Sequence, residues 1–188
     1  MNNRLINTLI VLVFISSFSN CASFSKIPIE KHSKSQLVSD FEKINGKYLF
    51  YSISDTLKKD NIYENLLGVW WRSEDSQLEL NNEDDEYYAE IKLINENELD
   101  FRLFKNEVLV KNETIKGKLK DGMFYLNQNF SISGLPYVFG TFTNDKKRII
   151  LKDNSIIIDR IKHEFGAVIL IFEAGFKYDS LSEYIKIE

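Results

Sequence analysis

The chain contains one cysteine, Cys21, among 188 residues, with only two prolines, eight glycines and two histidines. A single cysteine excludes an intrachain disulfide, so the fold must be stabilised by packing. The scarcity of proline and glycine argues against a disordered chain. Fourteen Phe, nine Tyr and two Trp supply apolar side chains for a sizeable core. We therefore expect a packed globular domain.

The chain also lacks a basic block, since 24 basic and 28 acidic residues give a net charge of −4. Proteins that bind nucleic acid usually carry a cluster of basic residues, which this sequence lacks. We therefore predict no nucleic-acid partner. The sequence contains no glycine-rich nucleotide loop, no Gly-x-Ser-x-Gly elbow and no His-Glu-x-x-His pair. We therefore predict a protein without catalysis, cofactor or metal, and keep a hydrolase only as a third hypothesis.

An apolar run from Leu5 to Phe18 follows a short polar start that carries one cation, Arg4. This arrangement is typical of the n-region and h-region of a secretory signal. As a helix the run spans about 21 Å, which is short of the roughly 30 Å core of a bilayer. The run therefore predicts export through a membrane rather than a permanent transmembrane helix.

The run ends in Ser17-Phe18-Ser19-Asn20-Cys21, with small residues between an apolar residue and the cysteine. This segment resembles the lipobox of bacterial lipoproteins, in a relaxed form because Phe18 and Asn20 replace the usual Leu and Gly or Ala. The resemblance implies cleavage before Cys21, diacylglycerol on its thiol and often a further acyl chain on its amine. It also implies a lipid-anchored protein of the bacterial envelope, with the outer membrane favoured and the domain facing the periplasm or the exterior. An uncleaved signal anchor and an ordinary secreted protein are the alternatives.

Three segments follow from this prediction: a signal peptide at 1–20, a tether at 21–39 and one domain at 40–188. Cleavage leaves 168 residues and removes one cation and no acid, so the net charge becomes −5. The tether is rich in Ser and Lys and has little periodicity. Eighteen flexible residues reach about 20 to 25 Å on average, so we expect the domain to stand clear of the lipid headgroups.

The domain reads as short strands separated by turns. Apolar and polar residues alternate in three stretches, 87–93, 99–104 and 115–120. Asp121-Gly122 is typical of a type I′ hairpin, and Asn144-Asp145-Lys146-Lys147 and Asp153-Asn154 predict further turns. The apolar run from Val168 to Phe172 predicts a strand covered on both faces. We predict an antiparallel meander of about eight to ten strands, forming a barrel or, as the alternative, a β-sandwich.

One helix is predicted near 57–71, because apolar residues recur there with helical spacing. The same segment holds Gly68-Val69-Trp70, which resembles the Gly-x-Trp motif of lipocalins. That resemblance implies that the meander forms a lipocalin-like barrel, whose first strand opens at this glycine and whose interior binds a small apolar ligand.

The leading functional hypothesis is a domain that binds a small apolar ligand or an envelope protein. The aromatic residues predicted to line a cavity are Trp70, Trp71, Tyr88, Tyr125 and Phe139. The alternative from another class is a structural or interaction lipoprotein with a filled core.

Two other groups contain residue types that can bind a metal ion. We interpret both as surface features. His163 has Asp159 four residues before it, but the domain holds no second histidine, and we interpret His163 as a residue of a surface turn. The cluster Glu83-Asp84-Asp85-Glu86 lacks the spacing of a calcium loop, and we interpret it as a solvated hairpin tip.

Overall fold

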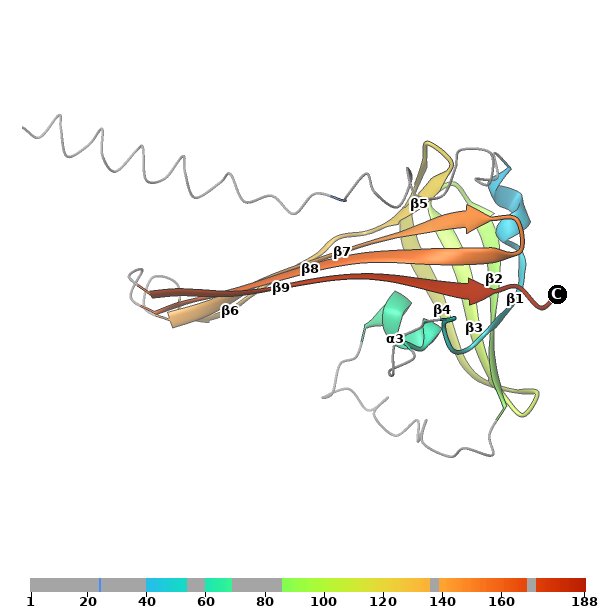
Figure 1. Cartoon of the computed structure of the whole chain (residues 1–188), viewed down its shortest axis with the longest axis horizontal. Coiled ribbons are helices and arrows are strands. Elements are labelled where there is room, and N and C mark those ends of the chain that lie inside the picture. Colours follow the sequence, from blue (N-terminus) through green and yellow to red (C-terminus); the bar gives the residue numbers. More distant parts are fainter. Residues whose placement is uncertain (1–23, 25–39, 54–59, 69–85, 136–138, 169–171) are drawn as a thin grey trace, which may run out of the picture.

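The computed structural model describes residue 24 and residues 40–53, 60–68, 86–135, 139–168 and 172–188. These residues form a curled antiparallel meander with one short α-helix (Figure 1), which confirms the predicted fold class and is consistent with a lipocalin-like barrel. The strands are β1 (Gly46–Leu49), β2 (Tyr87–Asn95), β3 (Glu98–Lys105), β4 (Val108–Lys120), β5 (Met123–Leu126), β6 (Asn129–Leu135), β7 (Phe139–Lys152), β8 (Ser155–Val168) and β9 (Phe172–Ile185). The helices are the 3-10 helix η2 (Phe41–Ile44) and the α-helix α3 (Ile62–Leu67).

The sheet follows the order β1-β2-β3-β4-β5-β7-β8-β9, and β6 pairs with β7 outside this path. Its two ends meet where the C-terminus passes β1. Tyr48 forms an isolated antiparallel bridge with Lys186, and the amide of Ile187 donates to the carbonyl of Lys47 at 2.8 Å. Gly46 lies at this seam, where an added Cβ would collide with the backbone oxygen of Glu188. A glycine is required there because the backbone of β1 and that of the C-terminal residues approach so closely.

Side chains from all around the curled sheet converge on one core. The largest fully buried members include Tyr48, Phe101, Phe124, Ile149 and Tyr184. Strand alternation explains the selection, because Ala89 and Ile91 point inward from β2 while their neighbours point outward. The core is thus contiguous from β1 to β9 and is filled by side chains.

Helix α3 lies against this core and is tied to the ends of the sheet. Ile62, Tyr63 and Leu66 are buried in the core, and the helix ends at Gly68, whose φ of 87° favours glycine. The amide of Ile62 donates to the carbonyl of Phe50 at 2.9 Å. The helix lies within the predicted range 57–71, although residues 69–71 fall outside the described residues.

Tight turns connect neighbouring strands of the barrel. Asp121 and Gly122 have φ values of 53° and 73°, as the predicted type I′ hairpin between β4 and β5 requires. Asn106 and Glu107 turn β3 into β4 with φ values of 48° and 64°. The predicted turn at Asp153-Asn154 is also confirmed, since β7 ends at Lys152 and β8 begins at Ser155.

Strands β7, β8 and β9 are each 14 residues long and run well beyond the curled part of the sheet (Figure 1). With β6 they form a projecting four-stranded ribbon, in which β6 pairs with residues 139–145 of β7. We call this part, residues 129–135, 139–145, 162–168 and 172–178, the ribbon, and the curled remainder of the sheet the barrel.

A predicted turn and a predicted strand were wrong in the long strands. Asn144-Asp145-Lys146-Lys147 is not a turn, because β7 continues through all four residues and pairs with β8 without interruption. The run from Val168 to Phe172 is not one strand, because β8 ends at Val168 and β9 begins at Phe172, its antiparallel partner. In both cases long hairpin pairing overrides the local composition.

Candidate functional site

Three of the residues predicted to line a cavity are described, namely Tyr88, Tyr125 and Phe139, and these three are not gathered around the barrel interior. Tyr88 lies on the outer face of β2, where its ring stacks on Phe104 at 4.8 Å between centroids. Its hydroxyl donates to Glu107 at 2.9 Å, and the ammonium of Lys47 lies 5.3 Å from the ring centroid. Its half-buried position on the outer face and its hydrogen bond to the Glu107 carboxylate suit a surface residue. Partial burial and this bond, which favours the protonated phenol, raise the pKa of Tyr88.

Tyr125 also faces outward, since its neighbour Phe124 points into the core. It packs against a small second cluster on the outer face, formed by Met123, Ile150 and Ile157. Tyr88 and Tyr125 therefore occupy the outer faces of different strands. The structure does not bring them together at one site.

Phe139 is the first residue of β7 and pairs with Leu135 and Val168 in the ribbon. Ten residues of extended strand, roughly 33 Å, separate it from Ile149 in the core. Trp70, Trp71 and Cys21 fall outside the described residues.

A polar network fastens α3 to the sheet. The side-chain amide of Asn65 donates to the hydroxyl of Tyr184 at 2.7 Å, and the hydroxyl of Ser182 donates to the carboxylate of Asp60 at 2.8 Å. Burial raises the pKa of Tyr184 above its ordinary value. The ammonium of Lys147 donates to the carbonyl of Leu66 at 2.9 Å, near the C-terminal end of the helix, where a cation is favoured.

Lys147 belongs to a buried charged cluster at the border between the barrel and the ribbon. Asp145 accepts two hydrogen bonds from Arg160, at 3.0 and 2.8 Å, and its carboxylate lies 3.6 Å from the ammonium of Lys147. Burial is the largest influence on Lys147 and lowers its pKa to about 8, although the Asp145 carboxylate opposes the shift. The cluster holds two cations around one carboxylate, an arrangement that is costly unless every partner stays in place.

A second buried ion pair lies on the opposite face of the same strands. Arg148 donates to Asp159 from Nε at 2.8 Å and from a terminal nitrogen at 2.7 Å. Burial nonetheless raises the pKa of Asp159 because it outweighs the attraction of Arg148. His163, predicted to lie in a surface turn, instead lies within β8 and pairs with Asn144 and Lys177. Among the described residues no group of three metal-ligating side chains forms a metal site.

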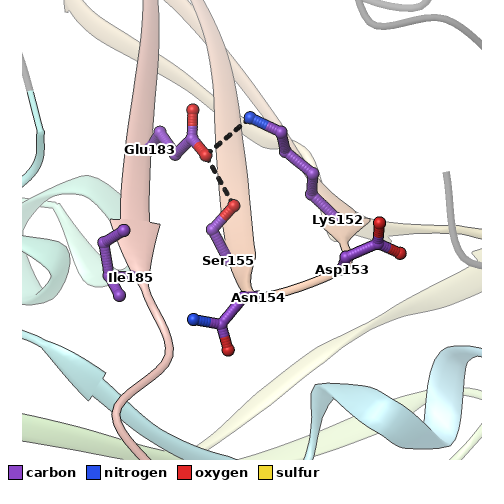
Figure 2. A pocket seen from close by; sticks show the side chains of 6 residues that line it. All are labelled: Lys152, Asp153, Asn154, Ser155, Glu183 and Ile185. Atoms are coloured by element: carbon purple, nitrogen blue, oxygen red, sulfur yellow. Dashed lines mark hydrogen bonds and ion pairs between the residues drawn. The ribbon is translucent and has the colours of Figure 1, made fainter. Parts of the chain in front are cut away.

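A shallow hollow of about 240 Å³ lies beside the turn between β7 and β8 (Figure 2). Glu183 points into it and accepts hydrogen bonds from Lys152 at 2.8 Å and from Ser155 at 2.6 Å. Ligand pockets are usually larger, about 300 to 1,000 Å³, and offer polar groups that are free to bind. The hollow is better explained as a hydrogen-bonded hairpin end than as a binding site.

The ribbon carries large exposed side chains on both of its faces. Phe176 is 61% exposed and Tyr178 is 36% exposed on one face, and Phe142 is 38% exposed on the other. Residues that pair directly across neighbouring strands share a face. Phe142 pairs with Phe165 and Phe176 pairs with Glu164, so the two aromatic residues lie on opposite faces. Sequence reasoning missed these three exposed residues. The exposure of Phe176 and Tyr178 becomes visible only when β9 is known to start at Phe172, and that of Phe142 only when β7 is known to pair with β8 up to Phe139.

Within the described part of the chain, no helix has both the length and the apolar character needed to cross a bilayer. Comparisons of the chain with protein-family models, curated proteins and solved structures found no match. The candidate site is therefore defined by the geometry of this chain alone: a barrel with a filled core and a ribbon with exposed aromatic side chains.

Proposed function

We propose that this chain is a lipid-anchored interaction protein of the bacterial envelope, which binds another protein through the ribbon. The observation that carries the proposal is the division between a barrel core filled by side chains and a ribbon with exposed Phe142, Phe176 and Tyr178. Aromatic side chains are enriched at protein interfaces, and exposed aromatics grouped on a projecting element are costly to leave in water.

The edges of the ribbon add to this proposal. β6 has β7 as its one partner among the named strands, and β9 is the last strand of the sheet order. The part of β9 that lies in the ribbon thus presents backbone groups at a sheet edge, and such edges accept strands from partner proteins. Lys177 forms an ion pair with Asp179 at 2.8 Å on this edge, and charged side chains of this kind limit unspecific pairing.

The anchor part of the proposal comes from the lipobox that ends at Cys21. Each methylene of an acyl chain that enters the bilayer contributes about 0.8 kcal/mol to membrane binding, so two or three chains hold a protein essentially permanently. Mass spectrometry of the protein extracted from membranes with detergent tests this part. We expect an N-terminus at Cys21 with added acyl mass, and an unmodified Cys21 would rule the anchor out.

Site-specific photo-crosslinking in intact envelopes tests the ribbon part. A photoreactive phenylalanine analogue placed at Phe176 should give a discrete adduct with one partner protein. The matched control places the same analogue at Val108, which is 64% exposed at the turn between β3 and β4 in the barrel. We expect the adduct only at position 176, weakened by the substitution Tyr178→Ser. Equal adducts at both positions would contradict a binding surface on the ribbon.

A binding site for a small apolar ligand inside the barrel is the competing hypothesis. It requires an open cavity, whereas Phe101, Phe124, Tyr48 and Tyr184 meet in the core and α3 packs against them. The filled core supports the interaction hypothesis over the ligand-binding one.

A further inference from the structure

Phe24 is the one described residue of the predicted tether, and it lies against the outer face of the sheet. Its ring meets the ring of Tyr125 edge-on at 5.8 Å between centroids. The guanidinium carbon of Arg148 lies 4.5 Å from the centroid of the Phe24 ring. Arg148 is held in turn by its two contacts with Asp159, so Phe24 packs on a well-fixed platform.

This contact limits where the anchor can lie. Cys21 lies three positions before Phe24 in the sequence, and an extended chain spans at most about 3.6 Å per residue. The Cα atom of Cys21 therefore lies within about 11 Å of that of Phe24. The free reach of 20 to 25 Å predicted from the sequence is therefore not available between Cys21 and this contact, because Phe24 is bound to β5 and β7.

The surface beside this contact is basic. Lys116, Lys118 and Lys120 occupy alternate exposed positions on β4. Lys118 lies directly opposite Tyr125 in the register between β4 and β5, and Lys120 lies opposite Met123. They are therefore the cations nearest to the platform that holds Phe24, on the side of β5 away from Arg148.

Acidic residues border this surface. Glu96 is one of them, because its carbonyl accepts a hydrogen bond from the amide of Leu119 at 2.7 Å. Glu98 lies opposite Lys116 across β3, and Asp121 follows Lys120 in the hairpin turn. Lys118 is flanked by Lys116 and Lys120 along its own face of β4, and by Tyr125 on β5. In a chain with a net negative charge, this lysine row is a local exception that favours an anionic partner.

From these two observations we propose that the outer face of β4 and β5, centred on Lys118 and Lys120, docks on the anionic lipid headgroups of the membrane that holds the anchor. The proposal rests on the proposed acylation of Cys21, because acyl chains entering the bilayer there bring this face to the headgroups. Each lysine near an anionic surface contributes attraction that falls off within a Debye length, about 8 to 10 Å. Docking fixes the orientation of the barrel, so the ribbon is presented to its partner in one direction.

The test uses the acylated full protein, purified in detergent and reconstituted on vesicles of phosphatidylcholine or of phosphatidylcholine with 30% phosphatidylglycerol. Lys120→Cys introduces a thiol on the docking face, and its labelling by a membrane-impermeant maleimide is timed. Val108→Cys is the matched control, because it lies on the same strand roughly 40 Å away along β4. Both variants replace exposed residues and should fold. Equal labelling rates of the two variants in detergent check this.

We expect labelling at position 120 to be at least fivefold slower on anionic than on neutral vesicles, with no such difference at position 108. Adding Lys118→Glu to Lys120→Cys should restore fast labelling, because the charge reversal weakens docking. Equal rates at position 120 on both kinds of vesicle would overturn the docking face, provided that mass spectrometry finds acyl mass on Cys21. Absence of that acyl mass would instead overturn the anchor in the proposed function, so the two failures are distinguishable.

Discussion

The same three strands, β7, β8 and β9, form both the barrel wall and the ribbon, and the two regions differ in what lies on their inner face. In the barrel, Ile149 pairs with Ile158 and Ile156 pairs with Tyr184, and all four are fully buried. In the ribbon, the corresponding face carries exposed Phe176 and Tyr178. One strand can thus serve a closed core and an open surface, and a change of side chains alone marks the transition.

The border between the two regions is the charged cluster of Asp145, Lys147 and Arg160. Its ions lie where the apolar core ends, and Lys147 reaches across to the carbonyl of Leu66 in α3. The cluster closes the polar end of the core and lets the strands continue outward. Substitutions in the core, in this charged cluster and in a turn therefore test the difference between the barrel and the ribbon. They are described from the largest expected effect on stability to the smallest.

The largest effect is expected for a cavity in the barrel. Phe101→Ala removes a fully buried ring and should lower the free energy of unfolding by about 3 to 5 kcal/mol. Phe176→Ala, the ribbon control, removes an exposed ring and should change it by less than about 0.5 kcal/mol. Urea unfolding followed by circular dichroism measures both. Similar losses for the two variants would show that the ribbon is part of the cooperative core.

The next effect is expected at the border. Asp145→Asn leaves the buried Lys147 and the half-buried Arg160 without their carboxylate partner and should cost about 3 kcal/mol. Asp100→Asn is the matched control, because Asp100 forms an ion pair with Arg102 at 2.9 Å on the outer surface. That pair should be worth less than about 1 kcal/mol. If both variants lost equal stability, the cluster would have no special structural role.

A smaller effect is expected from alkaline titration of Lys147. Its pKa of about 8 in the folded protein is below the ordinary value of 10.5, so between these values the unfolded chain binds more protons. The folded state should therefore gain about 2 kcal/mol of stability as the pH rises from below 8 to 9.5. Above pH 10 the trend reverses, because burial raises the pKa of Tyr48 and Tyr184 and only the unfolded chain ionises these phenols.

Lys147→Met tests that assignment. Urea unfolding at several pH values should show a rise in stability between pH 8 and 9.5 in the natural protein and a flat profile in the variant. A rise of the same size in Lys147→Met would assign the alkaline effect to another group.

The smallest effect is expected at the hairpin that ends β4. Gly122→Ala places a Cβ on a residue with a φ of 73° and should cost about 1 kcal/mol. Lys120→Ala, two residues earlier on the exposed face, should stay within about 0.5 kcal/mol of the natural protein. Thermal unfolding compares them. A neutral Gly122→Ala would mean that the turn relaxes without strain.

Local patterns predicted the barrel well because its signals are local. The alternation over 87–93 and 99–104 and the Asp121-Gly122 dipeptide each lie within a few residues, and each formed as predicted. The strand through Asp145 was missed because the partners of its carboxylate, Arg160 and Lys147, are brought in by pairing with β8 and by the strand itself. A polar run reads as a turn until those partners are known.

The candidate site was harder to predict for a related physical reason. The alternation that placed Ala89 and Ile91 inside already placed Tyr88 on the wet face with Glu90 and Lys92, so a signal against a cavity role for Tyr88 was present. No comparable signal exists for Phe176, whose exposure depends on how far β9 extends past the barrel. The contact of Phe24 with Tyr125 joins segments about a hundred residues apart, and no local sequence pattern predicts it.

Native mass spectrometry of the mature protein most directly tests the central claim that the barrel interior is a structural core and the ribbon is the binding surface. We predict a mass equal to the chain plus its covalent acyl groups, with no further mass released on unfolding. A lipid or other apolar molecule bound in stoichiometric amount, and lost when the barrel unfolds, would contradict the claim.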